Sequence, residues 1–70
     1  MESIKMEKQI KEALAQHAQG QIAKHKANVS IYLKNPVGIG EHPGVLEAIE
    51  EEIQMIAKYN DQLEVLNTYF

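Results

Sequence analysis

Apolar residues recur every three or four positions over two long stretches of this chain, a spacing typical of amphipathic α-helices. In the first stretch, residues 4–34, no proline intervenes and His25 fills the one gap in a stripe made of Met6, Ile10, Leu14, Ala18, Ile22, Val29 and Leu33. In the second, residues 43–68, the steps alternate between three and four along a heptad seam that reads Leu46, Ile49, Ile53, Ile56, Asn60, Leu63, Asn67 and Phe70. The pattern therefore predicts two long helices.

A short segment between the two stretches carries signals for a chain reversal. Pro36 ends the first helix, because a proline disfavours helical geometry in the residue before it and cannot donate a backbone hydrogen bond. Gly38 and Gly40 permit a tight turn, and Pro43 suits the first turn of the second helix. We expect Val37 or Ile39 to fold over the end of the helix pair.

The expected fold is all-α: an antiparallel two-helix hairpin in a single domain, residues 1–70. Ser3 is the expected N-cap of the first helix. A chain of 70 residues without cysteine has no disulfide to support a small core. Because a lone hairpin leaves apolar side chains in water, we expect a homodimer that forms a four-helix bundle. A higher oligomer and a different protein partner remain open as alternatives.

Charge is divided unevenly between the two halves. Lysines predominate in residues 1–34 and acids in residues 41–70, and the whole chain has a net charge of −3 with no arginine. This balance argues against nucleic acid as a partner, since such binding depends on a basic surface. No apolar run approaches the length of a membrane span, and the first residues lack the apolar core of a signal peptide. We therefore expect a cytoplasmic protein with no membrane association.

Three histidines were considered as metal ligands. His17 and His25 are eight residues apart, about 12 Å along a helix axis, which is too far to share one ion. His42 belongs to the predicted turn. We predict no metal site, with His25 in or beside the core stripe and His17 partly exposed.

The glycine-containing turn resembles a phosphate-binding loop only superficially. Gly38, Ile39 and Gly40 precede a helix start, where free backbone N–H groups attract anions. However, no strand precedes the turn, and the lysine and hydroxyl residue of a P-loop are missing. The favoured interpretation is a sharp connection between helices. The alternative is an anion or ligand site formed by Val37 to His42.

Acidic and amide side chains of the second helix have mainly structural interpretations. The run Glu50, Glu51 and Glu52 faces three directions on a helix, which predicts a solvated surface rather than a catalytic carboxylate. Asn60 and Asn67 fall at seam positions, where an amide fixes register and oligomeric state. A contact with a partner helix is the functional alternative for these two asparagines.

Two aromatic residues end the sequence. Tyr69 and Phe70 are expected to pack against the beginning of the first helix. The alternative is that they dock into a partner, because aromatic residues often anchor interfaces.

Two segments of the chain are similar to known sequences. Residues 32–43, Tyr-Leu-Lys-Asn-Pro-Val-Gly-Ile-Gly-Glu-His-Pro, with the following Val45-Leu46-Glu47-Ala48-Ile49-Glu50, resemble small uncharacterised proteins of T4-like phages, notably marine cyanophages. The ending, residues 61–70, is similar to theirs. The resemblance implies a phage protein acting in the bacterial cytoplasm or in assembly, and it carries over no catalytic residue.

The sequence thus predicts a non-enzymatic protein that self-associates and acts through protein–protein contacts. It contains no convergent reactive cluster, and we assign no catalytic, cofactor-binding or metal-binding residue and no cofactor. The residues singled out for interaction are Val37, Gly38, Ile39, Gly40, His42, Asn60, Asn67, Tyr69 and Phe70. The alternative function is a small ligand-binding module that uses the loop of residues 37–42.

Overall fold

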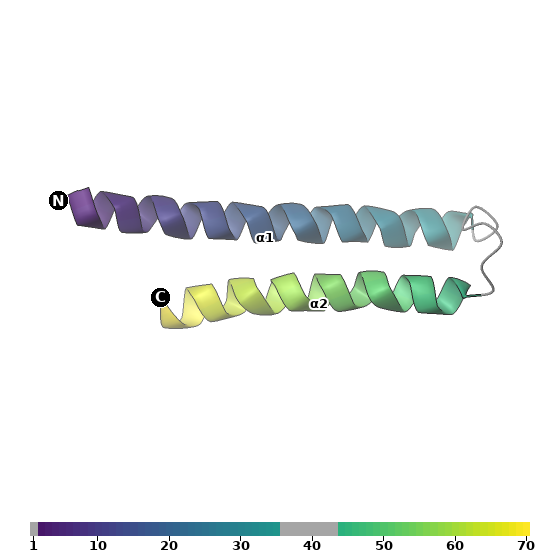
Figure 1. Ribbon diagram of the computed structural model, residues 1–70. Helices are drawn as coiled ribbons and strands as arrows, with labels where there is room; N and C mark the ends of the chain where they lie inside the picture. Colours follow the sequence, from purple (N-terminus) through teal and green to yellow (C-terminus); the bar gives the residue numbers. More distant parts are fainter. Residues whose placement is uncertain (1, 36–43) are drawn as a thin grey trace.

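Two antiparallel helices form the whole of the described structure. The computed structural model describes residues 2–35 and 44–70, in which α1 (Glu2–Lys34) is followed by α2 (Val45–Tyr69). The helices lie side by side and run in opposite directions, and the first turns of α1 extend beyond the end of α2 (Figure 1). The predicted all-α helical hairpin is confirmed. The expectation for Val37 and Ile39 lies outside the described residues.

The helix ends differ slightly from those predicted. Because α1 already begins at Glu2, Ser3 is inside the helix, and its assignment as the N-cap is wrong. The N-cap of α2 is Gly44, with φ −104° and ψ 51°, and its carbonyl accepts a hydrogen bond from the Ala48 N–H at 2.9 Å. Since Gly44 is not helical, α2 starts two residues later than predicted. It ends at Tyr69, where the Phe70 N–H donates to the Leu66 carbonyl at 3.1 Å.

The face of α1 that packs against α2 consists of three rows with a spacing of seven residues. The central row is Lys11, Ala18, His25 and Tyr32, and the flanking residues that are also at least partly buried are Ala15, Gln21, Ile22, Asn28 and Val29. A seven-residue period is characteristic of helices that wind around each other. Ala18, Ile22, His25 and Val29 therefore belong to the contact as predicted, whereas the predicted core residues Leu14 and Leu33 are 54% and 66% exposed.

The packing face of α2 also has three rows. Its central row is Val45, Glu52, Tyr59 and Leu66, with Ala48 and Met55 along one flank and Ile49, Ile56 and Leu63 along the other. The predicted seam is thus half correct. Its Ile49–Ile56–Leu63 row contacts α1, but its other row, Leu46–Ile53–Asn60–Asn67, is exposed. We call this exposed row the outer row of α2. Asn60 and Asn67 are exposed in the hairpin, so their role in fixing register and oligomeric state stays a prediction.

The interior of the hairpin is small. Ala18, at 2% exposed, is the only buried hydrophobic residue among those described, and His25, at 8%, is the only buried polar one. No large side chain in residues 2–35 and 44–70 is fully buried. Neither described helix has a segment both long enough and apolar enough to cross a membrane.

Candidate functional site

A polar cluster lies in the middle of the helix–helix contact. His25 Nδ1 of α1 is 2.5 Å from Glu52 Oε2 of α2, and the Asn28 Nδ2 group donates to the same oxygen at 3.1 Å. The side chains of His25 and Glu52 are only 10% and 16% exposed. The helical spacing of His25 and Asn28 puts both on one face of α1, so a single carboxylate joins two residues of the opposite helix.

The environment of Glu52 lowers the pKa of its carboxyl group. Burial acts in the opposite direction, because it disfavours the charged form, and this is the largest single influence. The hydrogen bonds from His25 and Asn28, together with the electrostatic influence of His25 and Lys24, outweigh burial and leave the pKa of Glu52 below its ordinary value. The carboxylate of Glu52 is therefore ionised in the folded hairpin at neutral pH.

The second ring nitrogen of His25 has no comparable partner. Nε2 is buried and makes no hydrogen bond with any residue that the structure describes. If the ring is neutral, a proton on Nδ1 that is donated to Glu52 leaves Nε2 as an unpaired acceptor. A histidine oriented by a carboxylate is also the arrangement of a general base. Here Nε2 is buried within the hairpin, and the contacts that the cluster makes connect the two helices.

Sequence reasoning missed the role of Glu52. The sequence pattern predicts a solvated run for Glu50, Glu51 and Glu52, and this is correct for Glu50 and Glu51, which are exposed. It is wrong for Glu52, because that residue shares the central row of α2 with Val45 and Tyr59. The available signal was the seven-residue spacing of these three positions.

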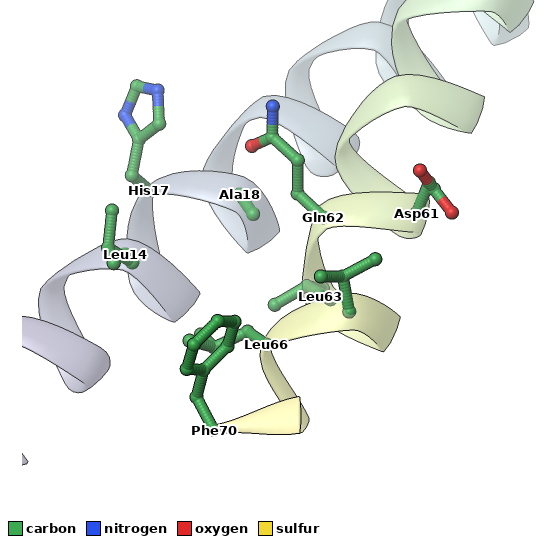
Figure 2. Close-up of a pocket in the computed structure, with 9 residues that line it drawn as sticks. Leu14, His17, Ala18, Asp61, Gln62, Leu63, Leu66 and Phe70 are labelled. Carbon is green, nitrogen blue, oxygen red and sulfur yellow. The ribbon is translucent and has the colours of Figure 1, made fainter. Parts of the chain in front are cut away.

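An apolar groove lies between the helices near the end of α2. Figure 2 shows Leu14 and Ala18 of α1 on one side and Leu63, Leu66 and Phe70 of α2 on the other, around a volume of about 320 Å³. The polar residues of its lining are His17, Asp61 and Gln62. The groove is open to solvent and contains no convergent set of charged groups.

A second groove continues the first along α1. Its volume is about 500 Å³, and it shares Leu14, Leu66 and Phe70 with its neighbour. Met6 and Ile10 contribute the remaining apolar lining, and these residues are 59% and 55% exposed. The Lys11 ammonium group at this site contacts the Phe70 main-chain carbonyl and the Glu7 carboxylate, the latter at 3.0 Å. Together the grooves form one extended apolar surface.

The two terminal aromatic residues lie mostly in solvent, although Phe70 borders the same groove as Met6 and Ile10 near the beginning of α1. Tyr69 and Phe70 are 73% and 74% exposed. Phe70 lines both grooves while most of its surface faces solvent. Docking of these aromatic residues into a partner stays a prediction.

The structure describes two of the three histidines, His17 and His25. His25 is in the packing stripe as predicted, and His17 is exposed, with its ring 5.7 Å from that of Tyr59 in an edge-to-face arrangement. Within residues 2–35 and 44–70, no three potential metal-ligating side chains come together. The candidate loop residues Val37, Gly38, Ile39, Gly40 and His42 lie outside the described part of the chain.

Comparison with known proteins returns no relative: the chain matches no protein-family model, no curated protein and no solved structure. The resemblance to small phage proteins stays a prediction, because these comparisons do not bear on it.

Proposed function

We propose that this chain is a non-enzymatic protein that associates with a second copy of itself and acts through protein–protein contacts. The observation that supports the proposal is the lack of a sufficient core in one hairpin. Ala18 is the only buried hydrophobic side chain in the described structure. The large apolar residues that remain exposed are Ile4, Met6, Ile10, Leu14, Ile31, Leu33, Leu46, Ile53, Val65, Tyr69 and Phe70.

Exposure on this scale is unfavourable for an isolated chain. Removing a large apolar side chain from water contributes about 1.5–3 kcal/mol, so a hairpin that leaves so many of them exposed loses much of the stabilisation available to it. Two helices alone rarely supply a stable core, whereas four helices enclose one between them. A two-fold dimer of hairpins is the simplest closed assembly that provides four.

The dimensions of the hairpin suit such a dimer. Twenty-five residues of α2 span about 37 Å. A face two helices wide measures about 20 Å across, and therefore offers on the order of 700 Å² per copy. Stable protein–protein interfaces bury about 800 Å² per partner. One face of the hairpin thus has roughly the area that a specific dimer requires.

The mass in solution tests the proposal. We expect light scattering after size exclusion to give about twice the chain mass of 7.9 kDa over a range of protein concentrations. At concentrations low enough for the dimer to dissociate, the mass is expected to fall, and the helix content measured by circular dichroism is expected to fall with it. A fully helical monomer at every concentration would contradict self-association.

A further inference from the structure

The heptad seam of α2 is covered on one side only. Its Ile49–Ile56–Leu63 row packs against α1, while the outer row, Leu46–Ile53–Asn60–Asn67, has no described residue over it. Leu46 and Ile53 are 74% and 52% exposed. A helix with a continuous three-and-four apolar spacing is built to contact neighbours on both rows. The outer row therefore lies directly beside the α1–α2 interface, at the position where a further helix would contact α2 in a bundle.

The outer row and the groove of Figure 2 lie on opposite edges of the hairpin. The groove is lined by Gln62, which continues the Ala48–Met55 flank of α2, and by Val65 in the adjoining row. The outer row adjoins the other flank, that of Ile49, Ile56 and Leu63. A substitution on one edge therefore tests that edge without changing the other.

Charge indicates which helix the outer row receives. The α1 helix contains six lysines and three glutamates, whereas α2 contains six acids and one lysine. Glu50 and Glu64 border the outer row on its solvent side, and both are exposed. A second α2 would bring acid against acid at this border, but an α1 from a second copy would bring lysines. Complementary charge selects partners and orientation in this way.

We propose that the outer row of α2 is the surface on which a second copy docks, and that the helix it receives is α1 of that copy. The inference rests on the proposed self-association and specifies its geometry. Acidic and basic helices then alternate around the four-helix bundle. Each α2 contacts its own α1 through the central row and the other copy's α1 through the outer row.

A matched pair of substitutions in α2 tests the surface. Ile53→Glu places a charge in the outer row, and Val65→Glu places one at the groove edge; the wild-type residues are both β-branched and exposed, at 52% and 39%. By light scattering, we expect Ile53→Glu to reduce the mass toward 7.9 kDa and Val65→Glu to keep the wild-type mass. The reverse result, or a wild-type mass for both variants, would overturn the assignment of the outer row.

A third variant avoids the risk that Ile53→Glu only unfolds the chain. Asn60→Leu adds an apolar side chain to the outer row at a position that is exposed in the hairpin. If a second copy covers the row, the dimer dissociation constant is expected to fall at least tenfold, measured by sedimentation across a dilution series. An unchanged constant would mean that Asn60 remains in water in the assembled protein and that the proposed surface is wrong.

The identity of the docking helix is tested by charge reversal. In the double variant Glu50→Lys, Glu64→Lys, both new lysines would face the lysines of the other copy's α1. We therefore expect the dimer dissociation constant of this variant to rise severalfold. Tightening of the dimer would instead show α2 against α2 and would overturn the choice of α1. A wild-type protein that is monomeric throughout would reject the proposed function itself. A wild-type dimer that is indifferent to these substitutions would reject only this inference.

Discussion

His25 and Glu52 join the two helices through a contact of 2.5 Å between Nδ1 and Oε2, in the packing rows through which α1 and α2 face each other. The two residues are 27 positions apart in the chain, and the contact therefore forms only when the hairpin closes. Because Asn28 also donates to Glu52, the three side chains fix the relative register of α1 and α2. A hairpin shifted by one helical turn would leave a buried carboxylate without its donors.

The first prediction concerns the coupling between these two residues. We expect His25→Leu and Glu52→Leu each to lower the free energy of unfolding by about 1–3 kcal/mol, because each leaves a buried polar group without its partner. The double variant is expected to lose less than the sum of the two, since it leaves neither partner behind. Chemical denaturation of the four proteins measures the coupling. Glu51→Ala, at an exposed neighbouring position, is the control and should change stability by no more than about 0.5 kcal/mol.

If the effects of the two single variants simply added, the contact would contribute nothing of its own. The role of the cluster in register would then have to be carried by Asn28 or by the apolar rows.

The second prediction concerns pH and depends on the lowered pKa of Glu52. Burial raises this pKa, but the hydrogen bonds from His25 and Asn28 and the nearby charged groups lower it by more than burial raises it. A carboxyl group whose pKa is lower in the folded state stabilises the fold above its unfolded pKa, which is about 4.3 for glutamate. That stabilisation is lost as the pH falls through the folded value.

Thermal unfolding of the wild type and of Glu52→Gln between pH 7 and pH 3 tests this sign. We expect the difference in Tm between the two proteins to be largest near neutral pH and to shrink as the pH falls below about 4. Comparing the two proteins removes the contribution of the other acids. A difference that grows toward low pH would mean that the pKa of Glu52 is raised in the folded protein.

The sequence was sufficient to predict the two helices, their antiparallel order and the place of His25, because these follow from local spacing and from the proline that ends α1. It was not sufficient to identify the central row of α2. A pattern that counts apolar residues favours Leu46 and Ile53 over Val45 and Glu52, yet the second pair faces α1. The seven-residue spacing of Val45, Glu52 and Tyr59 is compatible with a shared row, but the partner of Glu52 is on the other helix, and the local sequence does not identify that partner.

The orientation of the terminal aromatic residues could not be predicted for a similar reason. Whether Phe70 covers α1 or faces outward depends on how far α1 extends beyond α2, and on the space that Leu14 and Leu66 leave between the helices. Both are consequences of tertiary register. The sequence therefore allowed two interpretations, and docking into a partner stays a prediction.

The third prediction concerns Ala18, the buried alanine in the packing face of α1. Ala18 is 2% exposed, and a larger side chain there would have to separate α1 from α2. We expect Ala18→Leu to destabilise the hairpin by about 1–3 kcal/mol, the usual effect of overpacking. Ala23→Leu, at an exposed position of the same helix, introduces the same side chain without crowding and should be nearly neutral. Denaturant midpoints at equal protein concentration compare the two. Equal effects would mean that Ala18 is not at a tight contact.

The last prediction concerns Gly20, a glycine in the middle of α1. A Cβ atom added at Gly20 meets no atom within 4 Å apart from its chain neighbours and the backbone of its own helix turn, and the residue is outside the three packing rows of α1. Glycine within a helix costs about 0.5–1 kcal/mol relative to alanine. Gly20→Ala is therefore expected to stabilise the protein by about that amount and to leave its mass in solution unchanged. Ala23→Gly, the reverse change at another exposed position, should destabilise it to a similar extent.

If Gly20→Ala instead weakened the dimer, a second chain would have to approach α1 closely at Gly20. The outer row of α2 could then not be the whole of the docking surface.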